Sequence, residues 1–205
     1  MGRMFGKVGR PAEDRLLRQR EIFEAVAPLI LEVGARELTM RQAAHCASMS
    51  IGGLYHYFPS KRDLVLHSLQ PEAHDRLCID FNTIYGHLED SDPDAYLAAF
   101  IDFQVHAAAF LRPSLHAAIE LGAATVWPTL ERAMSLGLED WVRIAQRVVP
   151  DAGERDLVAL CRAVRRTMLG AMLDKTVTPV ELREVLRALI VGEPVGIRTE
   201  WARTA

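Results

Sequence analysis

The sequence is poor in cysteine and has no long hydrophobic run. Its three cysteines, Cys46, Cys78 and Cys161, are odd in number and far apart, which argues against a disulfide framework or a zinc site and predicts reduced thiols in a cytoplasmic protein. No segment approaches the roughly 18 consecutive apolar residues of a membrane span. No apolar segment follows the basic N-terminus, so we expect neither a signal peptide nor a membrane partner.

Motifs of enzyme chemistry are also missing. The sequence contains no phosphate-binding loop, no nucleotide-binding glycine fingerprint, no His-Glu-x-x-His and no Cys-x-x-Cys. The seven histidines are dispersed and form no cluster with acidic residues. We therefore predict no catalytic residue, no metal ligand and no cofactor, and an all-helical enzyme is the least favoured interpretation.

Signals of β-strands are nearly absent, whereas helical signals cover almost the whole chain. There is no sustained alternation of Val, Ile, Thr or Tyr, and no Asn-Gly or Asp-Gly pair that would mark a hairpin. Apolar residues instead recur at helical spacing, as in Leu182, Val185, Leu186, Leu189 and Ile190. The sequence predicts an all-α protein of about nine helices.

Glycine and proline indicate where several of these helices end. A first helix is predicted over residues 13–33, bent at Pro28 and ended by Gly34. Two further prolines are expected to interrupt the chain, so that helices cover residues 71–88 and 113–122. The other predicted helices cover residues 39–46, 51–57, 60–70, 93–112, a segment that begins near 128, 154–175 and 179–191.

Residues typical of helix N-termini precede many of these segments. Their side-chain oxygens can accept hydrogen bonds from the free N–H groups of the first helical turn. They are Thr39 with Gln42, Ser50, Ser60 with Asp63, Asp92 before Pro93, and Thr178 with Glu181.

Charge is distributed unevenly along the chain. Residues 1–71 hold 10 Lys and Arg against 7 Asp and Glu, whereas residues 72–205 hold 14 against 20. The first ten residues contain Arg3, Lys7 and Arg10 and no acid. The basic N-terminal part and the acidic C-terminal part predict that any polyanion binds at the N-terminal part, although so small an excess of positive charge also arises by chance.

Residues 39–57 have the pattern of a helix-turn-helix. Two short predicted helices flank a tight break at residues 48–50 and follow a longer helix. The second helix has no charged residue and contains Gly52 and Gly53, each of which costs a helix about 1 kcal/mol relative to alanine. Close approach of DNA to the helix N-terminus would explain such residues. A tight helix crossing in an ordinary bundle is the alternative.

The run from Thr39 to Lys61, TMRQAAHCASMSIGGLYHYFPSK, resembles the signature of the tetracycline-repressor (TetR) family. Gly34 lies five residues before the threonine, as in the family pattern, and Leu54-Tyr55-His56-Tyr57-Phe58 with Ser60-Lys61 is its most specific part. The resemblance covers about residues 13–70. The sequence departs from the pattern at Ser48, Ile51 and Gly53.

The resemblance implies a domain organisation and a function. Residues 1–12 would be a flexible basic arm, 13–70 a helix-turn-helix DNA-binding domain with its motif at 39–58, 71–192 an effector-binding and dimerisation domain, and 193–205 a tail. The protein would be a ligand-responsive transcriptional regulator, most often a repressor in this family. A homodimer would be released from a near-palindromic DNA operator by an unknown small apolar effector. An effector-free dimeric DNA-binding protein is the alternative.

The resemblance also implies which residues meet DNA. The residues near the groove or the phosphates would be Thr39, Ser50, Ile51, Gly52, Gly53, Tyr55, His56, Tyr57 and Lys61. Thr39 and Lys61 would contact phosphates, and Ile51 could contact a thymine methyl group. For Tyr57, packing inside the domain is an equal alternative. The basic arm could enter a minor groove or remain a solvated tail.

The C-terminal two thirds offers candidates for an effector site and a dimer interface. Aromatic and methionine side chains line adaptable apolar pockets, and the candidates are Phe100, Phe103, His106, Phe110, Trp127, Met134, Trp141, Met168 and Met172. Each can equally be ordinary core. Helices 154–175 and 179–191 carry more apolar surface than one partner face requires, so we expect the dimer to form through them. The alternative is that they only surround the core.

Overall fold

The structure is a computed structural model that describes residues 12–122, 142, 146 and 153–191. Residues 12–122 and 153–191 form nine α-helices and one 3-10 helix, and no strand occurs among the described residues. The all-α prediction is therefore confirmed. The predicted helix that begins near residue 128 lies outside the described residues. No helix in the described ranges is both long and apolar enough to cross a membrane.

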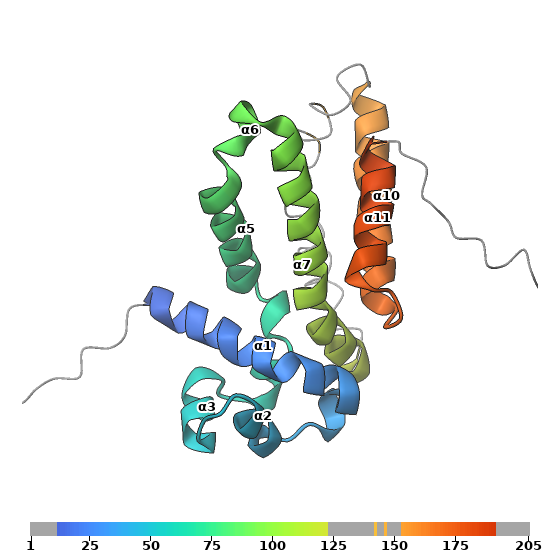
Figure 1. Ribbon diagram of the computed structural model, residues 1–205. Coiled ribbons are helices and arrows are strands. Elements are labelled where there is room, and N and C mark those ends of the chain that lie inside the picture. Colours follow the sequence, from blue (N-terminus) through green and yellow to red (C-terminus); the bar gives the residue numbers. More distant parts are fainter. Residues whose placement is uncertain (1–11, 123–141, 143–145, 147–152, 192–205) are drawn as a thin grey trace, which may run out of the picture. The chain divides into compact units, whose positions relative to one another are not determined.

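The described residues form two compact units (Figure 1). The first consists of residues 12–78 and 113–122, and the second of residues 79–112 and the described part of 131–205. The elements in chain order are α1 Ala12–Glu37, α2 Met40–Cys46, α3 Ile51–Tyr57, α4 Lys61–Val65, the 3-10 helix η1 His67–Leu69, α5 Pro71–Tyr85, α6 Leu88–Ser91, α7 Pro93–Leu121, α10 Glu154–Leu173 and α11 Pro179–Val191. Helices α5 and α7 contribute residues to both units.

The predicted helix starts are largely confirmed. Thr39 forms a capping box with Gln42, and the Ser50 side chain accepts a hydrogen bond from the Gly53 N–H. Ser60 accepts from the Asp63 N–H in the same way. The Asp92 carboxylate accepts from Ala95 N–H at 3.0 Å, and Thr178 and Glu181 cap each other's backbone. These contacts join residues three apart, so the local sequence is sufficient to predict them.

Gly34 interrupts α1 as predicted, but a further helical turn follows it. Its backbone is not helical, with φ +82° and ψ 161°, and the positive φ is one that glycine adopts readily. The chain then makes one more turn to Glu37, in which the Leu38 N–H donates to the Gly34 carbonyl at 3.1 Å. This turn leads directly to the Thr39 cap of α2.

Two predicted helices end earlier than expected. The helix predicted over 60–70 stops at Val65 and is followed by η1. In η1 the Ser68 N–H donates to the Ser114 hydroxyl at 3.3 Å and so does not continue an α-helical ladder. The helix predicted over 71–88 ends at Tyr85, and α6 follows after Gly86. The end of α10 also comes at Leu173, two residues before the predicted 175.

The prediction that Pro113 restarts the chain is wrong, because α7 continues through it to Leu121. Proline removes one helical hydrogen bond, and burial of the surrounding face can compensate for that loss. Pro113 and its neighbours Ser114 and Leu115 are all buried. Gly122, with φ +117°, ends the helix as expected.

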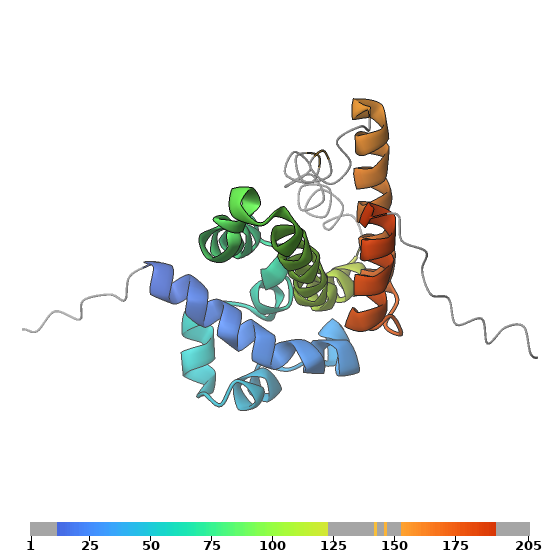
Figure 2. The same cartoon turned by 45° about the horizontal axis from the view of Figure 1, so that its top comes forward.

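The core of the first unit is built by α1 against the short helices. In both views α2 and α3 lie on one side of α1 (Figures 1 and 2). Leu54 of α3 and Leu64 of α4 are fully buried. His67 is 6% exposed and lies between two rings, with its centroid 5.6 Å from that of Phe23 and 5.3 Å from that of Phe58. Burial among apolar rings lowers the pKa of His67 from 6.5 to about 4, although Glu72 opposes this shift.

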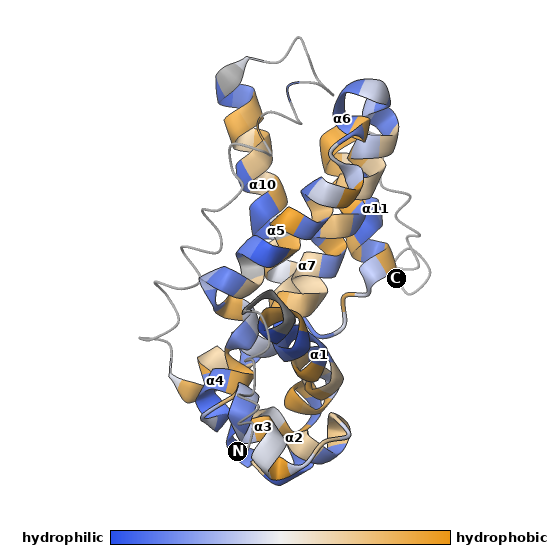
Figure 3. Cartoon of the chain, turned by 90° about the vertical axis from the view of Figure 1, so that its left-hand side faces the viewer, coloured by the Kyte–Doolittle hydropathy of each residue, from blue (hydrophilic) through white to orange (hydrophobic). Residues whose placement is uncertain are grey.

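The second unit is organised around aromatic rings and a helix pair. Phe81 of α5 lies within 6 Å, ring centroid to ring centroid, of four aromatic side chains, which are Tyr85, Tyr96, Phe100 and Phe103. Helices α10 and α11 pack against each other, and hydrophobic and hydrophilic residues alternate along their ribbons (Figure 3). Arg112 of α7 donates to the Ala171 carbonyl at 2.7 Å and to the Val177 carbonyl at 3.1 Å, and Arg183 of α11 pairs with Asp102.

His67 should make the protein sensitive to mild acid. The unfolded chain binds a proton at His67 near pH 6.5 and the folded chain only near pH 4, so stability is lost as the pH falls between these values. The loss at this site is about 3 kcal/mol at most. We predict that His67→Leu flattens the dependence of the unfolding free energy on pH over this window, measured by urea denaturation. The exposed His45, as His45→Gln, is the control, and parallel curves for His67→Leu and the wild type would contradict the prediction.

Candidate nucleic-acid interface

Helices α2 and α3 are joined by a tight turn at Ala47–Ser50. Ser48 has φ +51°, a left-handed conformation that serine adopts less readily than glycine. The Ser48 N–H donates to the His45 carbonyl at 3.0 Å and the Met49 N–H to the Ala44 carbonyl at 2.9 Å. These two bonds close the turn and hold the start of α3 next to the end of α2. The turn therefore forms without the glycine that the family pattern favours at this position.

The N-terminal end of α3 is open to solvent. Ile51 is 45% exposed, although a buried position would be usual for isoleucine. A Cβ atom on Gly52 would have no neighbouring atom within 4 Å, whereas one on Gly53 would lie 3.1 Å from the Ser50 hydroxyl. Gly53 therefore lies close to the cap, but nothing within the described protein requires a glycine at residue 52.

The C-terminal end of α3 is held by α1. Arg15 donates from a guanidinium nitrogen to the His56 carbonyl at 3.2 Å, and Gln19 donates to the Tyr57 carbonyl at 2.8 Å. The last carbonyls of a helix have no partner within it, and these two side chains supply one for each. Sequence reasoning missed both residues, since they lie 41 and 38 positions from their acceptors.

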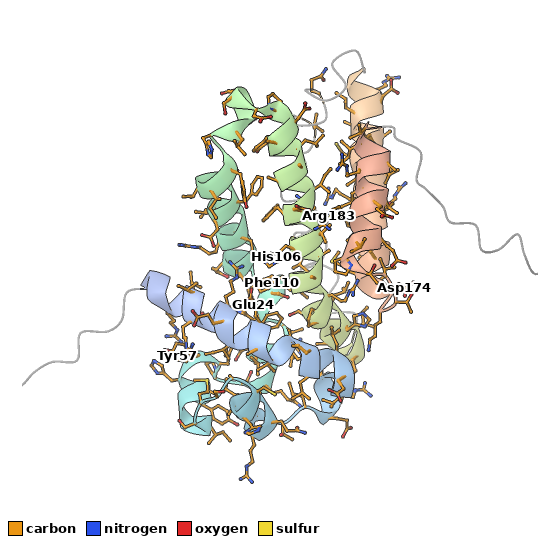
Figure 4. All side chains as sticks on the ribbon, in the orientation of Figure 1. Glu24, Tyr57, His106, Phe110, Asp174 and Arg183 are labelled. Carbon is orange, nitrogen blue, oxygen red and sulfur yellow. The ribbon has the colours of Figure 1, made fainter. Side chains whose placement is uncertain are left out.

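Most of the predicted DNA-contacting residues lie on the surface of this motif. Gly53 and Tyr57 are half-buried, and the Tyr57 ring packs edge-on against His56, with centroids 5.2 Å apart (Figure 4). The Thr39 hydroxyl donates to the Gln42 side chain at 2.7 Å. The exposed residues of the predicted set are Thr39, Ser50, Ile51, Gly52, Tyr55 and His56.

Lys61 differs from the rest of that set. It is half-buried, and its ammonium donates to the Arg36 carbonyl at 2.8 Å, so it links the start of α4 to the end of α1. Its predicted phosphate contact stays a prediction. Exposed Arg41, which sequence reasoning left out, offers a guanidinium on α2.

The surface of the motif carries no negative side chain. No Asp or Glu occurs between Glu37 and Asp63, while Arg41 and Arg62 are exposed. A surface with cations and no carboxylates can approach a polyanion without charge repulsion.

The predicted effector residues lie on α7 and α10 or outside the described residues. Phe100 and Phe110 are buried, Phe103 is half-buried and His106 is exposed, all on α7. Figure 4 labels His106 and Phe110 on this helix. Met168 and Met172 are buried on α10. The structure brings Phe100 and Phe103 together, with centroids 6.4 Å apart, beside Phe81, which sequence reasoning missed. Trp127, Met134 and Trp141 lie outside the described residues.

A metal centre is not formed by the described part of the chain. No three His, Cys, Asp or Glu side chains within it gather closely enough to hold an ion. Cys46 is exposed on α2 and Cys161 is buried on α10, and neither forms a disulfide.

Part of the first unit matches the sequence profile of a known family. Residues 22–67 match the sequence profile described as "Bacterial regulatory proteins, tetR family". No curated protein sequence matches the chain.

Solved structures share the fold. PfmR, a TetR family transcriptional regulator from Thermus thermophilus, is similar with a TM-score of 0.56 and 20% identity, over 82% of this chain and 96% of that one. GusR of Salmonella enterica has a TM-score of 0.53 and 20% identity, over 90% and 99%. A TerR/AcrR family transcriptional regulator from Aquifex aeolicus has a TM-score of 0.52 and 16% identity, over 83% and 95%.

The two glycines at the start of α3 should respond differently to alanine. Gly52→Ala adds a methyl group in open space, and alanine favours a helix by up to about 1 kcal/mol over glycine. Gly53→Ala places the same group 3.1 Å from the Ser50 hydroxyl that caps the helix. We predict that Gly52→Ala raises the thermal midpoint and that Gly53→Ala raises it less or lowers it. A larger rise in the thermal midpoint for Gly53→Ala than for Gly52→Ala would contradict the close approach of residue 53 to the Ser50 hydroxyl.

Proposed function

Since the chain carries the N-terminal domain of the tetR family of bacterial regulatory proteins, we propose that it binds operator DNA as a two-fold dimer through α3 and represses transcription until a small apolar effector binds. The observation that supports DNA binding best is the start of α3. An exposed isoleucine is followed by a glycine with open space around its Cα, on a motif surface without acids. Neither residue stabilises a helix that faces only solvent. In a DNA major groove, the isoleucine can contact a base and the glycine lets the backbone come close.

The exposed groups of α3 suggest how bases are read. Ile51 offers methyl groups to a thymine methyl, while the Tyr55 hydroxyl and the His56 ring can hydrogen-bond to base edges or phosphates. Gly52 lets the backbone approach the DNA. No Lys, Arg, Asn or Gln lies on α3, so the bidentate contacts that usually select guanine or adenine cannot come from this helix.

Attraction to phosphates must then come from outside α3. Arg41 on α2 is exposed and lies close in sequence to the Thr39 cap. Arg3, Lys7 and Arg10 precede the described residues and add three cations without an acid. In this proposal the arm and α2 supply salt-dependent affinity, and α3 supplies the sequence preference.

The proposed dimer interface lies on α10 and α11. Leu157 and Leu186 are buried inside the chain, with 1% and 0% exposure. Leu169 is half-buried and Leu173 is 44% exposed, one turn apart on α10. Apolar residues left on the surface of a helix pair are typical of a protein–protein contact.

The proposed effector site involves the buried aromatic and methionine residues of α7 and α10. Phe100, Phe110, Met168 and Met172 give this part of the second unit an apolar interior. An effector must bind more tightly to a form that cannot bind the operator, and a preference of about 3 kcal/mol reduces operator affinity more than a hundredfold. A cytoplasmic location accords with this role.

Gly52→Ala separates DNA binding from folding. The variant should be at least as stable as the wild type, because the added methyl group meets no protein atom. If the backbone of α3 approaches DNA closely, the same methyl group should weaken binding by roughly tenfold or more, about 1.4 kcal/mol. Binding is measured by fluorescence anisotropy on a duplex enriched from a random pool by the wild-type protein. A stable variant with wild-type affinity would remove α3 from the proposed interface.

Leu169→Arg tests the proposed dimer. Leu169 is half-buried, so an arginine there can reach solvent without unfolding the chain, but it would place a charge in the interface. We expect monomers in sedimentation-velocity runs, where the wild type sediments as a dimer. Ile84→Arg, at a site 57% exposed on α5, is the matched control and should remain dimeric. Leu186 is unsuitable for this test, because it is fully buried and a charge there would destabilise the fold itself. A dimeric Leu169→Arg protein would exclude this surface.

A further inference from the structure

The C-terminal end of α7 belongs to the same compact unit as the helix-turn-helix. Residues from Pro113 onward fall in the first unit, although α7 begins at Pro93 in the second. Ser114 is fully buried and accepts a hydrogen bond from the Ser68 N–H at 3.3 Å. Leu115 and Ala118 are each 1% exposed. The last two turns of α7 are therefore buried in the same compact unit as α2 and α3.

Glu120, near the end of α7, binds the turn that precedes α2. The Ala35 N–H donates to Glu120 Oε2 at 2.6 Å, and the Arg36 N–H donates to Oε1 at 2.9 Å. Arg36 also donates from its guanidinium to the Glu120 carbonyl at 2.8 Å. One carboxylate thus accepts two consecutive backbone N–H groups, which the break at Gly34 leaves without helical partners.

Gly34 is suited to this contact in two ways. Its φ of +82° strains any residue with a side chain, and a Cβ atom there would lie 2.9 Å from Glu120 Oε2. Sequence reasoning accounts for Gly34 only as the residue that ends the first helix. The structure adds the approach of the carboxylate.

Positive groups surround the same contact. The Lys61 ammonium donates to the Arg36 carbonyl, so α4 is tied to the turn that Glu120 holds. The two backbone N–H groups, the Arg36 guanidinium and the Lys61 ammonium lower the pKa of Glu120, which therefore stays ionised at neutral pH.

We infer that Glu120 is a positioning residue for DNA binding. Its carboxylate fixes the turn Ala35–Glu37, and this turn sets where α2 begins after Thr39 and hence where α3 lies. The inference rests on the proposed function, because it assigns a positioning role toward the same DNA-binding motif.

Glu120→Gln is the direct test. Glutamine keeps the size of the side chain, but it has one acceptor oxygen and an NH₂ group that cannot accept from a second N–H. We expect operator affinity to fall about tenfold, because a smaller fraction of molecules holds the motif ready for DNA. The readout is anisotropy on the enriched duplex, together with amide hydrogen exchange, which should become faster at Ala35 and Arg36.

Asp92→Ala is the matched control. Asp92 is also a carboxylate that accepts a backbone N–H at a helix start, but it lies at the opposite end of the same helix. Its loss should lower stability by a comparable amount and change operator affinity less than twofold. A merely structural role for Glu120 would make the two variants alike in DNA binding.

A second measurement needs no variant. If Glu120 positions the motif, linkage requires DNA to strengthen the contact, so exchange at the Ala35 and Arg36 amides should slow when the wild type binds the duplex. Unchanged affinity in Glu120→Gln, or unchanged exchange on binding, would overturn the inference while leaving DNA binding itself intact. A wild type that binds no duplex would instead contradict the proposed function.

Discussion

Helix α3 cannot maintain its own structure, and the first unit is built around that constraint. It has seven residues, two of them glycine, and a helix so short and so poor in helix formers is unstable alone. Ser50 caps its start, Leu54 anchors it in the core, and Arg15 and Gln19 of α1 donate hydrogen bonds to its last carbonyls. Its outer face is therefore not needed for packing and is available to a partner.

The same constraint separates the groups that hold α3 from those that would read DNA. The groups that hold α3 come from α1, from the turn and from the buried side of α3, whereas Ile51, Gly52, Tyr55 and His56 face solvent. The absence of acids from residues 38–62 lets this face approach a polyanion. Because α3 itself has no Lys or Arg, non-specific attraction and base recognition would arise from different elements.

Local patterns predicted much of this structure, and contacts between distant residues account for what they missed. The caps at Thr39, Ser50 and Thr178 were predictable because both partners lie within one helical turn. The continuity of α7 through Pro113 depends on burial by other elements, and the end of α4 at Val65 accompanies a bond from Ser68 to Ser114. Neither is encoded in nearby residues.

The candidate site divides in the same way. The exposed residues of α2 and α3 could be predicted from the motif, because aligning the sequence with the family pattern gives each residue a position in it. Arg15, Gln19 and Glu120 act across separations of 38 to 85 residues, and Phe81 joins Phe100 and Phe103 only after α5 and α7 have packed. A single sequence contains no signal that pairs such residues.

Selection of duplexes from a random-sequence pool by the full chain tests most directly whether α3 reads DNA from a symmetric dimer. We expect enrichment of a near-palindromic site, whose half-sites are spaced so that two α3 helices enter successive major grooves on one face of the duplex. Recovery of sequences no different from the input pool, or of a site without two-fold symmetry, would contradict it.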